Sequence, residues 1–227
     1  MTISSAKKSL VDSVKSKKNR GEKSREAILL AAAELATVRG LDGLSIGELA
    51  EHLGMSKSGL YAHFDSKEDL ELATIEMAGE IFGREVLTPA LRAPEGVRRI
   101  RALGEEFFSH IKRKVFPVGC FFAAAAAEMG MRPGPVRDRV VMTIQNWLGL
   151  LEQCVRDGQR LGEIDAGVDA AQAAFELESN FLTANALFVI TGDLKKLGQG
   201  RLGLEHQLER LAPQRGAGRL QKRLLAD

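Results

Sequence analysis

The chain has 227 residues, enough for one large domain or two small ones with a well-buried core. Its 44% hydrophobic and 27% charged residues are ordinary for a soluble globular protein, and two cysteines are too few for a disulfide-rich secreted scaffold. The net charge is +2, but residues 1–25 hold eight Lys or Arg against two acids, which leaves −4 for the other 202 residues. This asymmetry indicates a front that meets a polyanion, and the alternative is a solvated, disordered tail.

The cysteines and the apolar runs indicate where the chain resides. Cys120 and Cys154 lie in apolar or helix-like sequence without the spacing of a zinc site, so we expect reduced thiols. The polar, lysine-rich N-terminus has no apolar signal core, and the longest apolar run, 118–127, is about half of what a membrane helix needs. We therefore expect a cytoplasmic protein with no membrane partner.

The first part of the chain is expected to form a flexible arm followed by a helix. Residues 1–22 have few large apolar residues and no periodicity, which predicts a flexible basic arm. From Ser24, apolar residues recur at spacings of three and four until Arg39, and Gly40 follows where a helix C-terminus favours a left-handed residue. We therefore expect a first helix of about four turns.

Three further helix starts follow closely. Ser45 and Glu48 form a capping box for a second helix that ends at Gly54. Ser56 can cap a third helix of about eight residues through Phe64, and Ser66 a fourth that runs from residue 67 to about 87. Short helices joined by a tight glycine turn are the layout of a helix-turn-helix module.

Longer helices are expected beyond Pro89, over about 94–114, 117–130, 133–161, 169–190 and 193–211. Stretches of alternating β-branched residues are absent, so the sequence predicts an all-α fold. The expected domains are the arm at 1–22, a helix-turn-helix domain at 23–68, a larger helical bundle at 69–212, and a flexible tail at 213–227.

The short third helix has an apolar side and an outward side. Leu60 and Phe64 are four residues apart and account for docking on the first two helices. The outward set is small at its N-terminal end and aromatic at its C-terminal end, and comprises Lys57, Ser58, Gly59, Tyr61 and His63. A small end permits close entry into a DNA major groove, and tyrosine and histidine can donate to phosphates. The alternative for Tyr61 is a half-buried position between helices.

The stretch LSIGELAEHLGMSKSGLYAHFDSKEDL resembles the DNA-binding domain of TetR-family bacterial transcription regulators, in its "LA..LG.S", "LY.HF" and "SK..L" frames. The resemblance covers residues 24–70 and implies dimers bound to near-palindromic operators. It places Lys57, Ser58 and Gly59 near bases. It also implies that the DNA phosphates are bound by Tyr61, His63, Lys67, Ser45 and Arg25. Gly59 departs from the threonine or alanine that is more usual at its position.

A regulator of this type needs a sensor, which the second half must supply. Its aromatic residues could enclose an apolar cavity for a hydrophobic small-molecule inducer, or they could simply fill the core. The predicted pocket residues are Phe107, Phe121, Phe122, Glu128, Trp147 and Asn180, with Asn146 as a further polar candidate.

The last two long helices resemble the pair that forms the dimer interface in this family. One apolar stripe on the first of them has spacings of three and four and comprises Leu177, Phe181, Ala184 and Phe188. We expect this stripe at the interface of a homodimer, although such stripes are also common in cores.

Other signals favour neither an enzyme nor a cofactor site. The glycines of GQGRLG, 198–203, match a dinucleotide-binding loop but lack the strand that such a loop needs. The four histidines are scattered, with no metal-ligand pair and no nucleophile elbow. We expect no metal and no cofactor. Cys120 could be a redox-sensing thiol or a buried structural one.

The sequence therefore predicts a ligand-responsive, homodimeric repressor. Inducer binding would move the fourth helix, change the spacing of the two recognition helices and lower operator affinity. The alternative is that the protein activates transcription instead of repressing it. From another class, the alternative is a helical protein-interaction bundle whose basic arm binds acidic partners without sequence-specific DNA binding.

Overall fold

The computed structural model describes residues 3–129 and 133–213, with side chains described from residue 21 onward. Within these ranges the chain is helical and contains no strand, as the sequence predicts. None of the described helices is both long and apolar enough to cross a bilayer. The first four helices are α1 (Ile3–Arg39), α2 (Ile46–His52), α3 (Lys57–Tyr61) and α4 (Lys67–Phe82).

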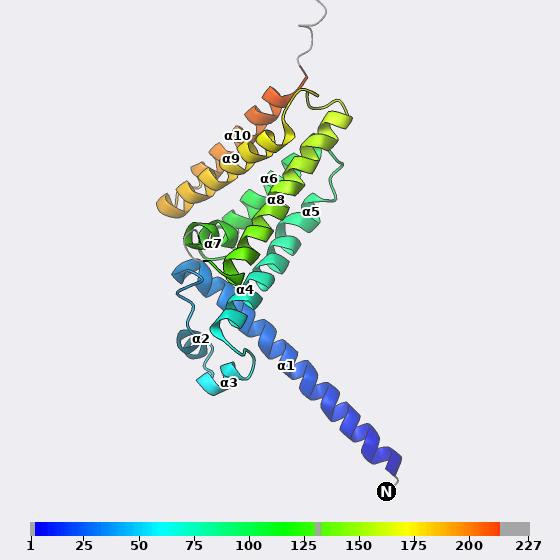
Figure 1. The fold of residues 1–227 in the computed structure, drawn as a ribbon, viewed down its shortest axis with the longest axis vertical. Coiled ribbons are helices and arrows are strands. Elements are labelled where there is room, and N and C mark those ends of the chain that lie inside the picture. Colours follow the sequence, from blue (N-terminus) through cyan, green and yellow to red (C-terminus); the bar gives the residue numbers. More distant parts are fainter. Residues whose placement is uncertain (1–2, 130–132, 214–227) are drawn as a thin grey trace, which may run out of the picture.

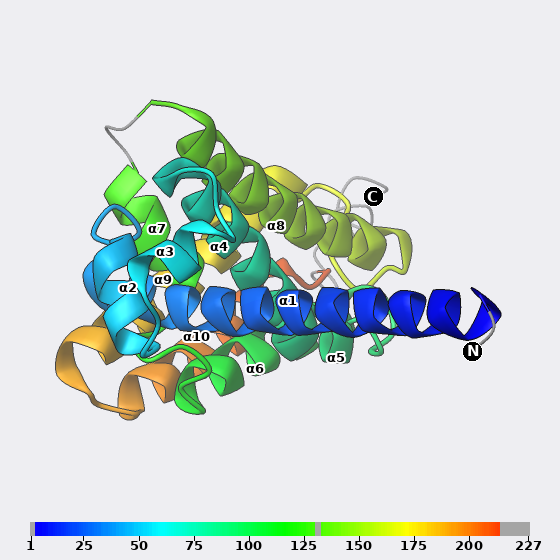
Figure 2. The same ribbon diagram turned by 90° about the horizontal axis from the view of Figure 1, so that it is seen from below.

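The second half of the chain forms a bundle (Figure 1). Its elements are a π-helical segment η1 (Gly83–Leu87), α5 (Thr88–Ala90), α6 (Val97–Lys112), α7 (Phe121–Met129), α8 (Pro135–Arg160), α9 (Ala170–Thr191) and α10 (Lys195–Leu211). Viewed from below, α1 lies across the molecule, with α2 and α3 gathered at one end of it (Figure 2).

Two hydrophobic clusters divide the molecule. The smaller one joins the C-terminal half of α1 to α2, α3 and the first turns of α4, and the larger one fills the bundle. Helix α4 belongs to both, because Ala73 packs in the smaller cluster while Ile75 and Ala78 pack in the larger one. Helix α4 therefore connects the two clusters.

The predicted helix starts are confirmed by their caps. The hydroxyl oxygens of Ser45, Ser56 and Ser66 accept backbone N–H groups three residues ahead, at 3.1, 3.1 and 3.0 Å. These bonds satisfy amides that have no partner inside their own helix. Gly40 and Gly54 adopt φ of +83° and +61°, so the glycines do end α1 and the α2 turn.

Several boundaries differ from the sequence prediction. The segment expected as a flexible arm, 1–22, is helical from Ile3 onward and continuous with α1, since it contains no proline and only one glycine to interrupt a helix. Helix α3 ends at Tyr61, not at Phe64, and η1 interrupts the helix that was expected to reach residue 87. The tail predicted at 213–227 lies outside the described residues except for Pro213.

Candidate nucleic-acid interface and ligand cavity

Helix α3 separates docking residues from outward residues. Leu60 and Phe64 are buried in the smaller cluster, whereas the side chain of Tyr61 is 57% exposed. Lys57 and Ser58 are also exposed, and Gly59 is partly buried. One face of α3 is thus occupied by packing, and the opposite one offers a lysine, a serine and a tyrosine to an external partner.

The N-terminal turn of α3 is thin, and its small residues hold it in place. The Gly59 N–H donates to Ser56 Oγ, and a Cβ on Gly59 would lie 3.1 Å from that oxygen. The side chain of Lys57 lies over α2, with Cε 3.2 Å from the position of a Cβ on Gly47. Glycine at position 59 therefore spares the cap oxygen a tight contact and leaves the turn narrow.

Arg25 and His63 are less available than their predicted role suggests. The Arg25 guanidinium lies 5.1 Å from the centre of the Phe64 ring, and His63 Nε2 lies 3.4 Å from Ser24 Oγ. Both residues are partly buried where α1 meets α3. Their contacts hold the end of α3 against α1, and phosphate binding by either residue stays a prediction.

Lys67 is engaged within the chain. Its Nζ donates to the Asp42 carbonyl oxygen at 2.5 Å and lies 3.6 Å from the buried carboxylate of Glu71. It thereby ties the first turn of α4 to the loop between α1 and α2. Ser45 accepts the Glu48 N–H, and its hydroxyl hydrogen can still be donated to a phosphate.

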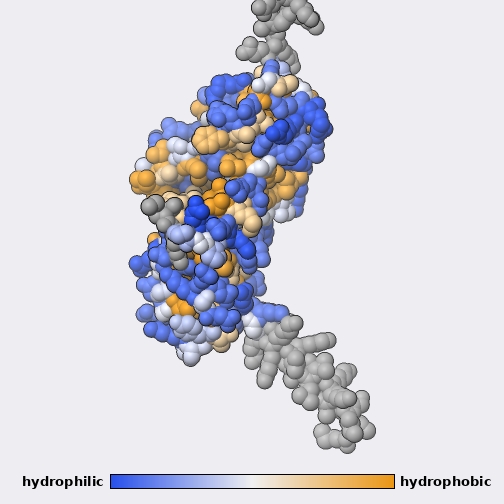
Figure 3. Space-filling model, in the orientation of Figure 1, coloured by the Kyte–Doolittle hydropathy of each residue, from blue (hydrophilic) through white to orange (hydrophobic). Residues whose placement is uncertain are grey.

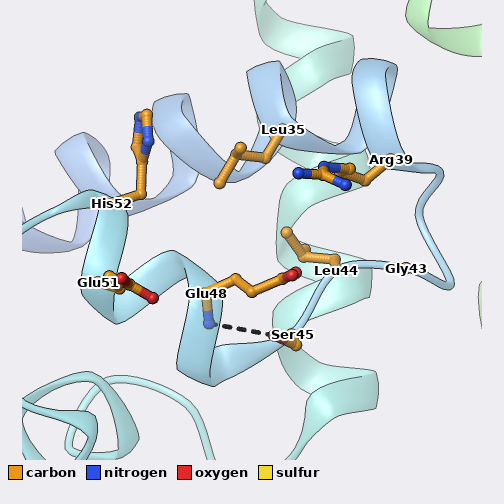
Figure 4. Close-up of a pocket in the computed structure, with 8 residues that line it drawn as sticks. All are labelled: Leu35, Arg39, Gly43, Leu44, Ser45, Glu48, Glu51 and His52. Atoms are coloured by element: carbon orange, nitrogen blue, oxygen red, sulfur yellow. Dashed lines mark hydrogen bonds between the residues drawn. The ribbon is translucent and has the colours of Figure 1, made fainter.

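A shallow depression of about 300 Å³ lies beside Ser45, between the end of α1 and α2 (Figure 4). Glu48, Glu51 and His52 line it from α2, and Arg39 lines it from the end of α1. Two carboxylates disfavour a polyanion there. The depression is therefore a poor nucleic-acid site, and the outward face of α3 is the better candidate.

Glu128 lies outside the cavity in which the sequence placed it. Its Oε2 accepts the Leu41 N–H at 2.6 Å, and its Oε1 accepts the Asp42 N–H. Both donors belong to the loop that begins at Gly40, where a Cβ would lie 3.0 Å from Oε2. Glu128 joins the C-terminal end of α7 to the α1–α2 loop, so the pocket assignment of this residue is wrong.

An apolar cavity of about 450 Å³ lies among α4, α6, α7, α8 and α9. Of the predicted pocket residues, Phe107, Phe122 and Trp147 line it, and so does Asn146. The remaining lining residues include Phe82, Leu87, Cys120, Thr143, Ile144, Phe175, Glu178, Ser179 and Leu182. The volume falls in the range of small-molecule sites.

Phe121 and Asn180 do not line this cavity. Phe121 is buried against Phe116 and Phe122, with ring centres 5.7 and 5.2 Å away, and so fills the core. Asn180 donates from Nδ2 to the Gly200 carbonyl oxygen at 2.7 Å and pairs α9 with α10. Both pocket assignments are corrected by these contacts.

Sequence reasoning missed Glu178. Trp147 Nε1 donates to its Oε2 at 2.6 Å, and burial raises the pKa of the carboxyl to about 7, although this hydrogen bond acts in the opposite direction. A signal was present, because Glu178 falls on the same face of α9 as the buried Ala174, Phe181 and Asn185. A carboxylate on such a face is costly and marks a candidate site.

Cys120 lies at the wall of the cavity but is poorly suited to redox sensing. Its N–H donates to Asn185 Oδ1 at 3.0 Å, and burial raises the pKa of its thiol to about 11. Since the thiolate is the reactive form, this environment favours an inert structural cysteine. Among the described residues there is no group of three or more potential metal ligands.

The predicted dimer stripe faces inward. Leu177, Phe181 and Ala184 are buried in the larger cluster, and Phe188 packs against it. A helical stripe shows which face is apolar but not which neighbour covers it, and here α6, α8 and α10 of the same chain cover it. This assignment is therefore wrong for the three buried residues, and for Phe188 it stays a prediction.

A second apolar stripe is exposed along α9 and reaches Leu202 on α10, and two of its members, Phe175 and Leu182, also line the cavity. Ile190 is 80% exposed, and hydrophobic residues gather at the edge of the molecule where α9 ends (Figure 3). The stripe, called the outer stripe below, comprises Phe175, Leu182, Leu187, Val189, Ile190, Leu194 and Leu202.

Two protein-family models match the chain. "Bacterial regulatory proteins, tetR family" matches residues 28–74, and "Tetracyclin repressor-like, C-terminal domain" matches residues 96–203. The matches thus cover the helix-turn-helix and most of the bundle as separate units.

Solved structures and a curated relative agree with the two family models. A TetR transcriptional regulator from Chloroflexus aurantiacus is 28% identical with a TM-score of 0.76, covering 82% of this chain and 94% of that one. AibR in complex with isovaleryl coenzyme A and operator DNA is 26% identical with a TM-score of 0.65, covering 79% and 97%. The HTH-type transcriptional activator FasR of Mycolicibacterium smegmatis is 33% identical over 88 residues, only 39% of this chain and 40% of FasR. The chain belongs to the TetR family and is a DNA-binding transcriptional regulator.

Proposed function

We propose that this protein is a homodimeric cytoplasmic repressor that binds a near-palindromic operator and is released by a small hydrophobic inducer. The observation that carries the proposal is an apolar cavity of about 450 Å³ whose walls include α4, the helix shared with the DNA-binding cluster. The structure of AibR holds both a ligand and operator DNA, which supports a ligand-responsive mode of action here.

On DNA, α3 would lie in the major groove with its thin N-terminal turn leading. Lys57 and Ser58 would contact base edges, and Gly59 would permit close approach without a contact of its own. Tyr61 and Ser45 would donate to phosphates. Arg25, His63 and Lys67 would contact only phosphates that come close to their present positions, because their intramolecular contacts restrict how far each side chain can reach.

The outer stripe would form the dimer interface. Two copies of α9 and α10 packed through these residues would bury side chains that one chain leaves exposed, and exposed apolar patches of this kind mark interfaces. The C₂ symmetry of such a pair would match a palindromic operator.

The coupling between cavity and operator would use two connections. Gly79 and Phe82 of α4 line the cavity, and so do Phe122 and Ala126 of α7, the helix that ends next to Glu128. A ligand that displaces α4 and α7 would shift the first turn of α4 and the α1–α2 loop together. A coupling of about 1 to 3 kcal/mol is the usual scale of such linkage.

The proposal is tested by selecting a duplex from a random pool and then measuring binding and regulation. We expect an inverted repeat, two chains per duplex by sedimentation, and higher reporter transcription when the gene is deleted. A selected site without symmetry would contradict the dimer, and lower transcription on deletion would show activation, the activity named for FasR. Failure to select any duplex would contradict the whole proposal.

A further inference from the structure

The sensor cavity contains one carboxylate in a wall that is otherwise almost entirely apolar or neutral. Glu178 Oε2 accepts the Trp147 Nε1–H at 2.6 Å. Within the described residues, Glu178 Oε1 has no hydrogen-bond partner. The side chain is thus only half satisfied, and its remaining acceptor borders a space of about 450 Å³.

The described residues that line the cavity include no lysine and no arginine. Burial accordingly raises the pKa of the Glu178 carboxyl to about 7, with no cation to oppose it. A ligand that brings a positive charge would provide the missing counter-charge, whereas a ligand with an acid group would face a carboxylate across an apolar space.

The walls beside Glu178 are aromatic. The Trp147 ring has Phe82 edge-on at 5.4 Å and Phe107 stacked at 6.5 Å between ring centres. Phe122 lies edge-on to Phe82 at 6.2 Å. The faces of such rings attract organic cations, with tryptophan the strongest, and their area also accepts an apolar body.

We propose that the cavity binds a hydrophobic organic amine, with its ammonium group paired to Glu178 and its apolar body among Phe82, Phe107, Phe122 and Trp147. The inference rests on the proposed function of the cavity as the inducer site. It names the chemical class of the inducer and the residue that selects it.

The single tryptophan makes the test direct. Trp147 is the only tryptophan of the chain, lines the cavity and donates to Glu178, so its fluorescence reports binding there without DNA. Three probes of one shape are titrated, namely 4-phenylbutylamine, 4-phenylbutan-1-ol and 4-phenylbutyrate, with isovaleryl coenzyme A as a fourth. We expect the amine to bind at least tenfold more tightly than the alcohol, and the acid and the thioester to bind more weakly still.

Two matched variants locate the selectivity. Glu178→Gln keeps the shape and an oxygen for the Trp147 N–H but removes the charge. It should lower amine affinity at least tenfold and change alcohol affinity less than threefold. Glu176→Gln alters an exposed carboxylate two residues away on the same helix and should leave both affinities unchanged.

The pH profile is a second readout. The described wall that Glu178 shares with the packed elements contains the rings of Phe82, Phe107 and Trp147 and one other titratable group, the Cys120 thiol, whose pKa burial raises to about 11. Glu178 must lose its proton to pair with the amine. Amine affinity should therefore increase with pH as the carboxyl ionises, by up to about tenfold per pH unit below pH 7, whereas alcohol affinity should not.

Each outcome decides the inference. Equal or tighter binding of the alcohol, the acid or the thioester would overturn it, and so would an amine affinity that Glu178→Gln leaves unchanged or the absence of any Trp147 response to the amine. If the protein binds a selected duplex but not the amine, the inference fails and the proposed function stands. If the amine binds but no duplex does, the proposed function fails and the ligand class stands.

Discussion

The helix-turn-helix and the helical bundle place their candidate functional residues in opposite environments. The helix-turn-helix buries Leu60 and exposes Tyr61 on the next position of the same short helix. The bundle instead encloses Trp147 and Glu178 in a cavity built from five helices. Local sequence can therefore specify the first surface, because docking and outward residues lie within one turn, whereas only tertiary packing specifies the second.

The largest predicted effect in this comparison is a loss of folding stability when Leu60 is truncated. Leu60→Ala should cost about 2–5 kcal/mol, since a fully buried leucine leaves a cavity in the smaller cluster. Chemical denaturation is the measurement, with Trp147 fluorescence following the bundle and circular dichroism following all helices. The control is Leu202→Ala, which removes a leucine of equal size from an exposed position. A Leu60→Ala variant as stable as that control would mean that α3 does not depend on its buried face.

A second prediction concerns pH and lies wholly in the bundle. Burial and the positive charge of Arg113 lower the pKa of His110 to about 4, and the negative charge of Glu85 opposes this shift. The unfolded chain gains this proton near pH 6.5 and the folded chain does not, so the stability due to His110 falls as the pH falls from 6.5 toward 4. The loss from pH 6.5 to pH 5 is about 2 kcal/mol.

Glu178 has the opposite dependence. Its folded pKa of about 7 exceeds the ordinary 4.5, so its contribution to stability is present below pH 4.5 and falls as the pH rises toward 7. Denaturation at pH 5 and 6.5 should therefore show a smaller acid loss in the wild type than in Glu178→Gln. In His110→Phe, stability should rise on going from pH 6.5 to pH 5. Identical slopes in all three proteins would contradict the burial of these two groups.

The smallest predicted effect tests the connection between the two regions. Glu128→Ala removes two carboxylate hydrogen bonds to the α1–α2 loop, so the loop should hold α2 and α3 less firmly. We expect about tenfold weaker duplex binding, about 1.4 kcal/mol, with probe binding at Trp147 unchanged. Glu152→Ala, which removes a carboxylate paired with Arg156 on α8 of the bundle, is the control. Equal duplex affinities for the two variants would exclude a role of Glu128 in coupling.

The same contrast explains what the sequence could predict. Three serine caps, two left-handed glycines and the inward position of Leu60 follow from spacing within a few residues, and all are present. Tertiary partners do not follow from spacing. Glu128 binds amides 86 and 87 residues away along the chain, and Phe181 is covered by helices of its own chain. For this reason half of the predicted pocket residues line the cavity and the predicted dimer stripe is in the core. The DNA contacts of Lys57 and Tyr61 stay predictions.

The family assignment also decides between the two classes that the sequence left open. A protein-interaction bundle without DNA binding would not be expected to match family models over both the helix-turn-helix and the larger bundle. The exposed face of α3 gives this assignment a physical basis, because it presents Tyr61 to solvent beside the buried Leu60.

The central claim is that the exposed face of α3 binds DNA, and duplex affinity of Tyr61→Ala tests it most directly. With a selected duplex and fluorescence anisotropy, we expect affinity to fall at least tenfold, while the denaturation midpoint and the Trp147 response to 4-phenylbutylamine remain those of the wild type. An unchanged affinity in a folded Tyr61→Ala protein would contradict the account.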